Sequence, residues 1–198
     1  YSSVDLRNAG FKLAPVDTNL FPAGFNNLND RFISLAVQAA QETLERLLPG
    51  CLRILLIPEN HTRNSFYFEN LSTLQDILEK AGFEVRIGSL LEEMPHAKEI
   101  VLASGARITL EPIVRVADQI KVKDFLPCCI LLNNDLANGI PEILQGIEQT
   151  ILPNMNLGWH SRLKSNHFRH YAQVAGEFAQ LLGLDPWLIT PLFSRCAE

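Results

Sequence analysis

The chain has no long uninterrupted hydrophobic run. Of its 198 residues 47% are hydrophobic. Yet the longest apolar stretches, Cys128–Leu132 and Leu52–Ile57 with Arg53 inside it, fall far short of the ~20 residues that a membrane-spanning helix needs. Basic charge is also scarce: the net charge is −5, so no global positive field attracts a nucleic-acid backbone. We therefore expect a folded chain that neither spans a membrane nor binds nucleic acid.

Cysteine is sparse, and its spacing matches no metal or redox motif. The four cysteines are Cys51, Cys128, Cys129 and Cys196, and none forms a Cys-x-x-Cys pair. A secreted disulfide scaffold would be shorter and richer in cysteine. We predict four reduced thiols in a cytoplasmic protein, with Cys128 and Cys129 packed inside a buried strand.

Catalytic and nucleotide-binding signatures are missing as well. The sequence contains neither the Rossmann glycine pattern nor a P-loop, and no pattern indicates Ser-His-Asp or Cys-His catalysis. Clusters of polar residues are therefore the candidate functional sites.

The periodicity of apolar residues predicts an α/β fold. Residues 1–29 are rich in Asn, Pro and Gly but carry phenylalanines that need burial, so we expect an ordered loop there. Residues 30–198 form the expected α/β domain, a mostly parallel sheet with helices on both sides. Its expected elements are a helix from Asp30 to Leu48, strands at 52–57, 83–87 and 128–132, a helix at 65–81, a hairpin at 99–111, a short helix at Pro141 and a last helix at 165–182.

Two polar clusters directly follow predicted buried strands. The first comprises Glu59, Asn60, His61, Thr62, Arg63 and Asn64, and the second comprises Asn133, Asn134 and Asp135. Ligands of open α/β sheets collect at the carboxyl ends of the strands, so we predict that both loops lie at one edge and share a substrate pocket. For the first cluster, the alternative is an exposed loop that ends in a helix cap. For the second cluster, the alternative is a set of Asx turns, in which the side chains bond their own backbone.

A third cluster places basic residues at the start of the last helix. It runs from Trp159 to His170, and we expect Arg162, Lys164, Ser165 and His167 to bind an anionic group such as a phosphate or a carboxylate. The alternative is a solvated basic helix face. Zinc bound by His160, His167 and His170 is a weaker hypothesis, so we expect no metal site here.

The segment from Asp17 to Asn27 is dense in Asn, Asp, Gly and Pro among aromatic residues. Such a loop suits recognition of a free amino acid: Asp17 offers an anion to the ammonium group, and Asn19, Asn26 and Asn27 offer amides that donate and accept hydrogen bonds. The alternative is a structural loop in which Asp17 and Asn19 cap turns.

Several stretches carry long and unusual motifs: Val4–Lys12, Pro15–Pro22, Gly24–Leu28, Ile57–Asn64, Leu131–Leu136, Gly139–Pro141, Gly158–Phe168 and Asp185–Ile189. Together they resemble the proteobacterial type of glutamate–cysteine ligase, also called gamma-glutamylcysteine synthetase. The resemblance covers nearly the whole chain in the same order.

The resemblance implies ATP-dependent ligation of the glutamate γ-carboxyl to the cysteine amine, the first step of glutathione synthesis, with ATP and Mg²⁺ as cofactors. It also implies a Rossmann-like domain like the one that precedes an ATP-grasp portion. No segment here matches that portion, and both ends look cut. We therefore expect a fragment of a longer ligase that supplies substrate-binding regions and is inactive alone. The alternative is a non-catalytic module that binds an amino acid or a nucleotide.

Overall fold

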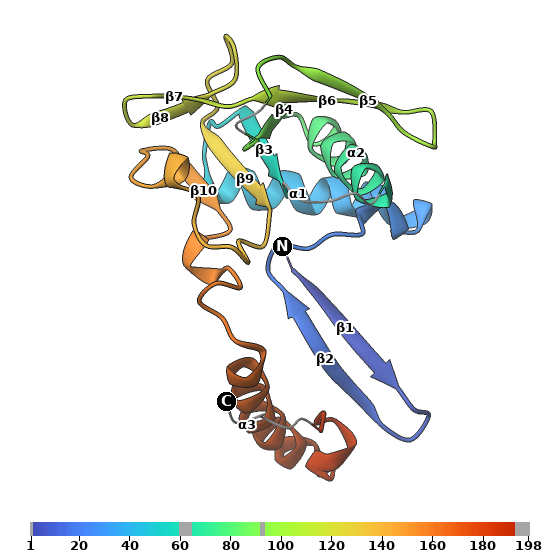
Figure 1. The fold of residues 1–198 in the computed structure, drawn as a ribbon. Coiled ribbons are helices and arrows are strands. Elements are labelled where there is room, and N and C mark those ends of the chain that lie inside the picture. Colours follow the sequence, from blue (N-terminus) through green and yellow to red (C-terminus); the bar gives the residue numbers. More distant parts are fainter. Residues whose placement is uncertain (1, 60–64, 92–93, 193–198) are drawn as a thin grey trace.

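The computed structural model describes residues 2–59, 65–91 and 94–192 (Figure 1). Its centre is a six-stranded sheet in the order β10-β9-β3-β4-β6-β5. The first five of these strands are mutually parallel, and β5 is antiparallel to β6. The strands are β3 (Arg53–Pro58), β4 (Glu84–Ser89), β5 (Lys98–Val101), β6 (Arg107–Pro112), β9 (Cys129–Asn133) and β10 (Thr150–Leu152). The α/β prediction and the 99–111 hairpin are thereby confirmed.

The two central strands explain why the sequence reads as continuous apolar runs. Residues 54–58 of β3 and all five residues of β9 are buried. Strands covered on both faces need apolar side chains at every position, without the alternation of a half-exposed strand.

Both long helices that cover the sheet lie on the same face. Helix α1 (Ile33–Leu47) and helix α2 (Ser65–Lys80) pack on each other and on the face that carries Ile54 and Leu56. The opposite face, with Leu55 and Ile57, is covered mainly by non-helical segments: Ile120, Val122, Phe125, Leu136 and the one-turn helix around Leu144. The expectation of a helix layer on each face is therefore wrong for the described residues.

The remaining short elements complete this covering. Strands β7 (Val114–Val116) and β8 (Gln119–Lys121) form a separate hairpin. The 3-10 helices are η1 (Phe25–Asn27), η2 (Asp30–Phe32), η3 (Glu142–Leu144), η4 (Met155–Leu157) and η5 (Pro186–Leu188). Asn29, not Asp30, caps η2, and the helix predicted at Pro141 is the single turn η3. In the part of the chain that the structure describes, no helix has the length and apolarity to cross a membrane.

The first 29 residues contain a hairpin where the sequence predicted a loop. Strands β1 (Ser3–Asn8) and β2 (Leu13–Asn19) pair antiparallel, and the Gly10 amide at the turn donates to Asn8 Oδ1 at 2.8 Å. Gly10 has φ 84°, a backbone conformation that glycine adopts without strain. Phe11, expected to be buried, is 68% exposed.

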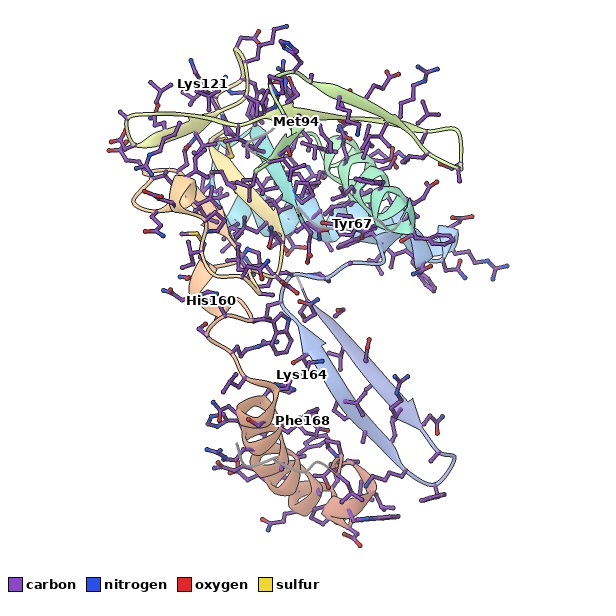
Figure 2. The ribbon with its side chains drawn as sticks, in the orientation of Figure 1. Tyr67, Met94, Lys121, His160, Lys164 and Phe168 are labelled. Carbon is purple, nitrogen blue, oxygen red and sulfur yellow. A yellow bond between two sulfur atoms is a disulfide. The ribbon has the colours of Figure 1, made fainter. Side chains whose placement is uncertain are left out.

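The hairpin and helix α3 (Lys164–Leu182) project away from the sheet together (Figure 1). Figure 2 shows Lys164 and Phe168 at the end of α3 that is nearest the sheet. The Phe11 ring stacks on Trp187, with ring centroids 5.8 Å apart, so contacts join the far ends of the two elements. We call β1, β2, α3 and η5 the arm.

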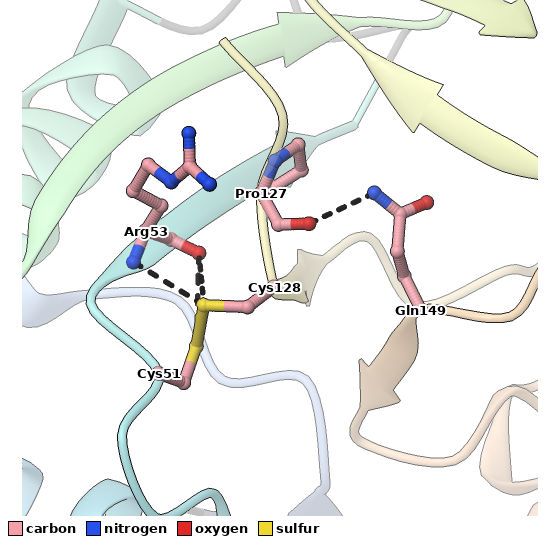
Figure 3. The surroundings of a disulfide bond; sticks show 5 residues. All are labelled: Cys51, Arg53, Pro127, Cys128 and Gln149. Carbon is pink, nitrogen blue, oxygen red and sulfur yellow. Dashed lines mark hydrogen bonds between the residues drawn. A yellow bond between two sulfur atoms is a disulfide. The ribbon is translucent and has the colours of Figure 1, made fainter.

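A disulfide joins Cys51 to Cys128, with Cα atoms 5.7 Å apart (Figure 3). The prediction of four reduced thiols is therefore wrong. Cys51 lies two residues before β3, and Cys128 lies directly before β9. Because β3 and β9 are neighbours in the sheet, the strand pairing brings together two cysteines that are 77 positions apart in the sequence.

The two adjacent cysteines have different surroundings. Cys128 is exposed, so its predicted role in core packing is wrong. Cys129 is fully buried and free, as predicted, and burial raises the pKa of its thiol to about 12. Cys196 lies outside the described residues.

Candidate functional site

The strand order creates a switch point between β3 and β9. From β3 the sheet extends to β4 and β6 on one side and to β9 and β10 on the other. Ligands of open α/β sheets bind in the crevice at the carboxyl ends of the strands at such a point. Pro58 pairs with Asn133, so Glu59 and the second polar cluster lie at one edge, as predicted. His61, Arg63 and Asn64 lie outside the described residues.

The protein's own segment 20–25 covers the switch point. The Asn133 side-chain amide donates to the Pro22 carbonyl at 2.6 Å, and Asn70 Oδ1 accepts from the backbone amides of Gly24 at 2.8 Å and Phe25 at 3.0 Å. Phe21, only 4% exposed, packs in the core cluster on the face opposite α1 and α2. The predicted pocket shared by the two strand-end loops is therefore closed at this position by the chain itself.

Two buried amides hold this segment in place. Asn70 Nδ2 donates to Asn133 Oδ1 at 3.1 Å, and the two residues are 1% and 2% exposed. The Tyr67 hydroxyl donates to the Asn133 carbonyl at 2.8 Å and accepts from the Glu59 amide at 2.9 Å. Buried polar groups are stable only when they are bonded, so this network fixes the edge of the sheet. Asn133 is an internal link in this network, and its predicted contact with substrate stays a prediction.

Sequence reasoning missed Asn70 and Tyr67. Both lie on the buried side of α2, whose apolar residues include Leu71 and Leu74. The available signal was a polar residue, Asn70, within that apolar periodicity, because an amide on a core-facing side needs a bonded partner.

Asn134 and Asp135 form the turn that was the alternative to ligand binding. Asn134 Oδ1 accepts from the Leu136 amide and Asp135 Oδ1 accepts from the Ala137 amide, both at 2.9 Å. Asn134 Nδ2 also donates to the Pro58 carbonyl at 3.3 Å. These bonds order the turn. A contact of either residue with substrate stays a prediction.

The Asp17–Asn27 segment is ordered by the same kind of turn. Asn19 Oδ1 accepts from the Phe21 amide at 2.8 Å, as the turn-capping alternative proposed. Asn26 is half-buried and Asn27 is exposed, both in η1. The side chain of Asp17 lies outside the described part, so its role as an ammonium anchor stays a prediction.

The basic cluster joins the arm to the sheet. Arg162 Nη2 donates to the Thr18 carbonyl of β2 at 2.5 Å, and the guanidinium lies 4.4 Å from the centre of the Trp159 ring. Lys164 Nζ lies 5.4 Å from the same ring, and a ring nitrogen of His167 lies 3.2 Å from Thr18 Oγ1. The Trp159 amide in turn donates to the Asp135 carbonyl at 2.9 Å. These contacts give the cluster a structural role, because they connect the arm to the edge of the sheet.

Part of the cluster retains capacity for an anion. Arg162 Nε is buried and has no hydrogen-bond partner among the described residues, and an unmet buried N–H favours an acceptor. Ser165 lies in the first turn of α3, beside Lys164. His160 and His170 are exposed, and the described ranges hold no group of three or more His, Cys, Asp or Glu side chains that could bind a metal ion.

A cavity of about 510 Å³ opens at the carboxyl edge on the β4 side of β3. We call it the edge pocket. Its charged lining residues are Glu59, Lys98 and Glu99, and Ser89, 5% exposed, ends β4 at its wall. The other lining residues are Pro58, Phe68, Leu91, Met94, Ile100, Val101 and Leu110. The position and the mixed lining are typical of a small-molecule site.

Only Glu59 of this pocket was predicted from the sequence. Lys98 and Glu99 belong to the hairpin strand β5, which reaches the pocket only because β6 pairs with β4. A second cavity, of about 420 Å³, lies between α1, α2 and the β9–β10 side of the sheet. Its lining is apolar except for Thr43, so it offers no charged group to an ionic substrate.

The family model of glutamate-cysteine ligase matches residues 1–198. The chain belongs to this family. A solved structure of a candidate gamma-glutamylcysteine synthetase from Methylobacillus flagellatus KT is 54% identical, with a TM-score of 0.91. The match covers 98% of this chain and 46% of that protein, so the chain spans less than half of this relative. Among curated proteins there is no match.

Proposed function

We propose that this chain is the part of an ATP-dependent ligase that binds the amino-acid substrates. The ligase joins the γ-carboxyl of glutamate to the amine of cysteine, the first step of glutathione synthesis, in the cytoplasm. The observation that carries the proposal is the family match over residues 1–198, supported by the 54% identity to the Methylobacillus protein.

The residues present indicate which part of the enzyme binds ATP and Mg²⁺. Ligation through an acyl phosphate needs Mg²⁺ and cationic groups at the transferring phosphoryl. Among the described residues there is no group of three or more His, Cys, Asp or Glu side chains that could hold a metal ion. We propose that ATP and Mg²⁺ bind mainly to the part of the protein that corresponds to the unmatched portion of the relative, and that the sheet is the domain preceding an ATP-grasp unit.

The substrate contacts come from two places in this chain. The edge pocket, with Glu59 and Lys98, holds an amino acid, and the loop residues Asp17, Asn26 and Asn27 are further candidates for substrate contact. Arg162, with Lys164, Ser165 and His167, offers the unmet Nε to an anionic group, either a carboxylate or a phosphate.

Phosphate release is the direct test. The complete protein should release phosphate from ATP only when glutamate and cysteine are both present, and residues 1–198 alone should release none. Phosphate release that does not depend on both amino acids would contradict the proposed reaction. Binding of an amino acid without any turnover by the complete protein would favour the alternative, a non-catalytic binding module.

A further inference from the structure

Helix α3 of the arm carries an apolar stripe that faces water. Val174, Phe178 and Leu181 are spaced by four and three residues, so they lie on one side of the helix. Their exposed fractions are 62%, 54% and 85%. The side of α3 that packs within this chain is a different one, and its buried residues are Ala175 and Ala179. The helix therefore has a second apolar side, which we call the α3 stripe.

The hairpin that accompanies α3 exposes apolar side chains as well. Val4 and Leu6 of β1 are 50% and 54% exposed, and Leu13 of β2 is 48% exposed. At the tip of the arm, Phe11 and Trp187 stack on each other but remain 68% and 46% exposed. Apolar surface thus extends over both elements that project from the sheet (Figure 1).

The two elements of the arm need a covering to be stable. A two-stranded hairpin is marginally stable in water, and a protein helix gains most of its stability from the packing of its apolar side. Burial stabilises in proportion to the apolar area removed from water, and the two buried alanines of α3 contribute little area. Exposed apolar surface of this extent is typical of an interface.

The size of the Methylobacillus relative indicates what covers the arm. The match includes 46% of that protein, so more than half of it lies outside the match. A second copy of the chain would bury one self-complementary patch on each copy. The apolar side chains here lie instead on a helix and on a hairpin, along the length of a projection. A further folded portion of the same chain is tethered to the arm, so it meets this surface at high effective concentration.

We propose that the arm is the interface with the portion of the complete protein that corresponds to the unmatched part of the relative. The α3 stripe is the centre of this interface, and Val4 and Leu6 of the hairpin extend it. The arm then connects the sheet to the portion that we propose binds ATP and Mg²⁺. The assignment rests on the proposal that the complete protein contains such a portion, but not on the reaction itself.

Photo-cross-linking in the complete protein tests what covers the α3 stripe. The photoreactive amino acid p-benzoylphenylalanine replaces Phe178, and mass spectrometry identifies the residue to which it bonds. We expect a bond to a residue outside 1–198 of the same chain. The same amino acid at Gln180, which is exposed on the polar side of α3, is the matched control and should form no such bond. A bond from position 178 to a second copy, a bond only to residues 1–198, or no bond beyond the control overturns the proposal.

Thermal unfolding of the complete protein gives a second, independent measurement. If Leu181 stays in water, as its 85% exposure in this chain implies, Leu181→Glu should be nearly neutral. If the stripe is covered, the buried charge should lower the apparent midpoint by about 4 °C or more, whereas Leu181→Met should not. Gln180→Glu adds the same charge one residue earlier, on the polar side, and should shift the midpoint by less than about 1 °C.

Equal small shifts for Leu181→Glu and Gln180→Glu overturn the proposal. Neither measurement depends on turnover, so the interface and the ligase function can fail separately. A bond from position 178 to the further portion, in a complete protein that releases no phosphate with glutamate and cysteine, would support the interface and contradict the ligase function.

Discussion

The Asn70 side chain should be a principal stabiliser of the carboxyl edge. Replacing Asn70 with Leu keeps a similar volume in the core but removes three hydrogen bonds, two accepted from the amides of Gly24 and Phe25 and one donated to Asn133. A buried polar group left without a partner costs about 1–3 kcal/mol. The Asn133 oxygen is buried, whereas water can reach the partly buried amides of segment 20–25. We therefore expect Asn70→Leu to lower the free energy of unfolding by about 2–4 kcal/mol.

Urea unfolding measured by fluorescence and by circular dichroism is the assay. The urea concentration at the midpoint of unfolding should fall. The slope of the unfolding free energy against urea concentration should stay constant, because the surface exposed on unfolding is unchanged. Asn166→Leu is the matched control: Asn166 is exposed on α3, and its change should alter stability by less than about 0.5 kcal/mol. If Asn70→Leu lowers the free energy of unfolding no more than Asn166→Leu does, the argument that the Asn70 amide holds segment 20–25 is refuted.

Three further predictions concern the thiols and the pH dependence of stability. Reduction of the Cys51–Cys128 disulfide, which closes a loop of 77 residues, should lower the free energy of unfolding by about 4 kcal/mol in the chain-entropy relation, measured by urea unfolding with and without reductant; unchanged stability would contradict it. The Cys129 thiol, with its pKa raised to about 12 by burial, should resist a thiol reagent at pH 8 in the folded protein and react after denaturation, as mass spectrometry of the labelled peptide can show. Hydrogen bonds from the backbone amide and the hydroxyl of Ser104 lower the pKa of Glu69, so the stabilisation is present above the unfolded pKa of about 4.3 and is lost as the pH falls through the folded pKa. The stability advantage of the unmodified protein over Glu69→Gln should therefore shrink as the pH falls from about 5 to about 3, and an advantage that grows with acidity would contradict the assigned sign.

Local sequence patterns predicted most of the sheet. Strands β3 and β9 are continuous apolar runs, and the periodicity of α2 and α3 is regular. Helix α3 begins and ends within one residue of its expected bounds, and Gly183 adopts φ 66° directly after it. These features depend on nearest neighbours in the chain, so a single sequence contains the information for them.

The features that the sequence did not predict depend on strand pairing between distant segments. The disulfide requires β3 beside β9, and the edge pocket requires β5 beside β6 and β6 beside β4. The network around Asn70 requires segment 20–25 to fold back over the sheet edge. Asn133 and Asn134 were correctly placed at that edge, but core and turn bonds engage them, and Asn19 caps a turn in its own loop.

In the arm, the sequence predicted helix α3 correctly but did not predict what packs against its apolar side. The apolar residues of α3 recur at helical spacing, but only Ala175 and Ala179 are buried, while Phe178 is 54% exposed. Periodicity fixes the helix and its apolar side, but does not determine what packs against that side.

The two central strands are fastened at both ends. At their amino ends the Cys51–Cys128 bond joins the chains that enter β3 and β9, and at their carboxyl ends the Asn70–Asn133 amides join the strands to α2 and to segment 20–25. A strand held at both ends cannot fray from one of them, so its amide protons exchange with solvent only through large cooperative openings. In the arm, few buried contacts oppose small openings. We therefore expect amide exchange to be slowest at the centre of the sheet and fastest at the tip of the arm.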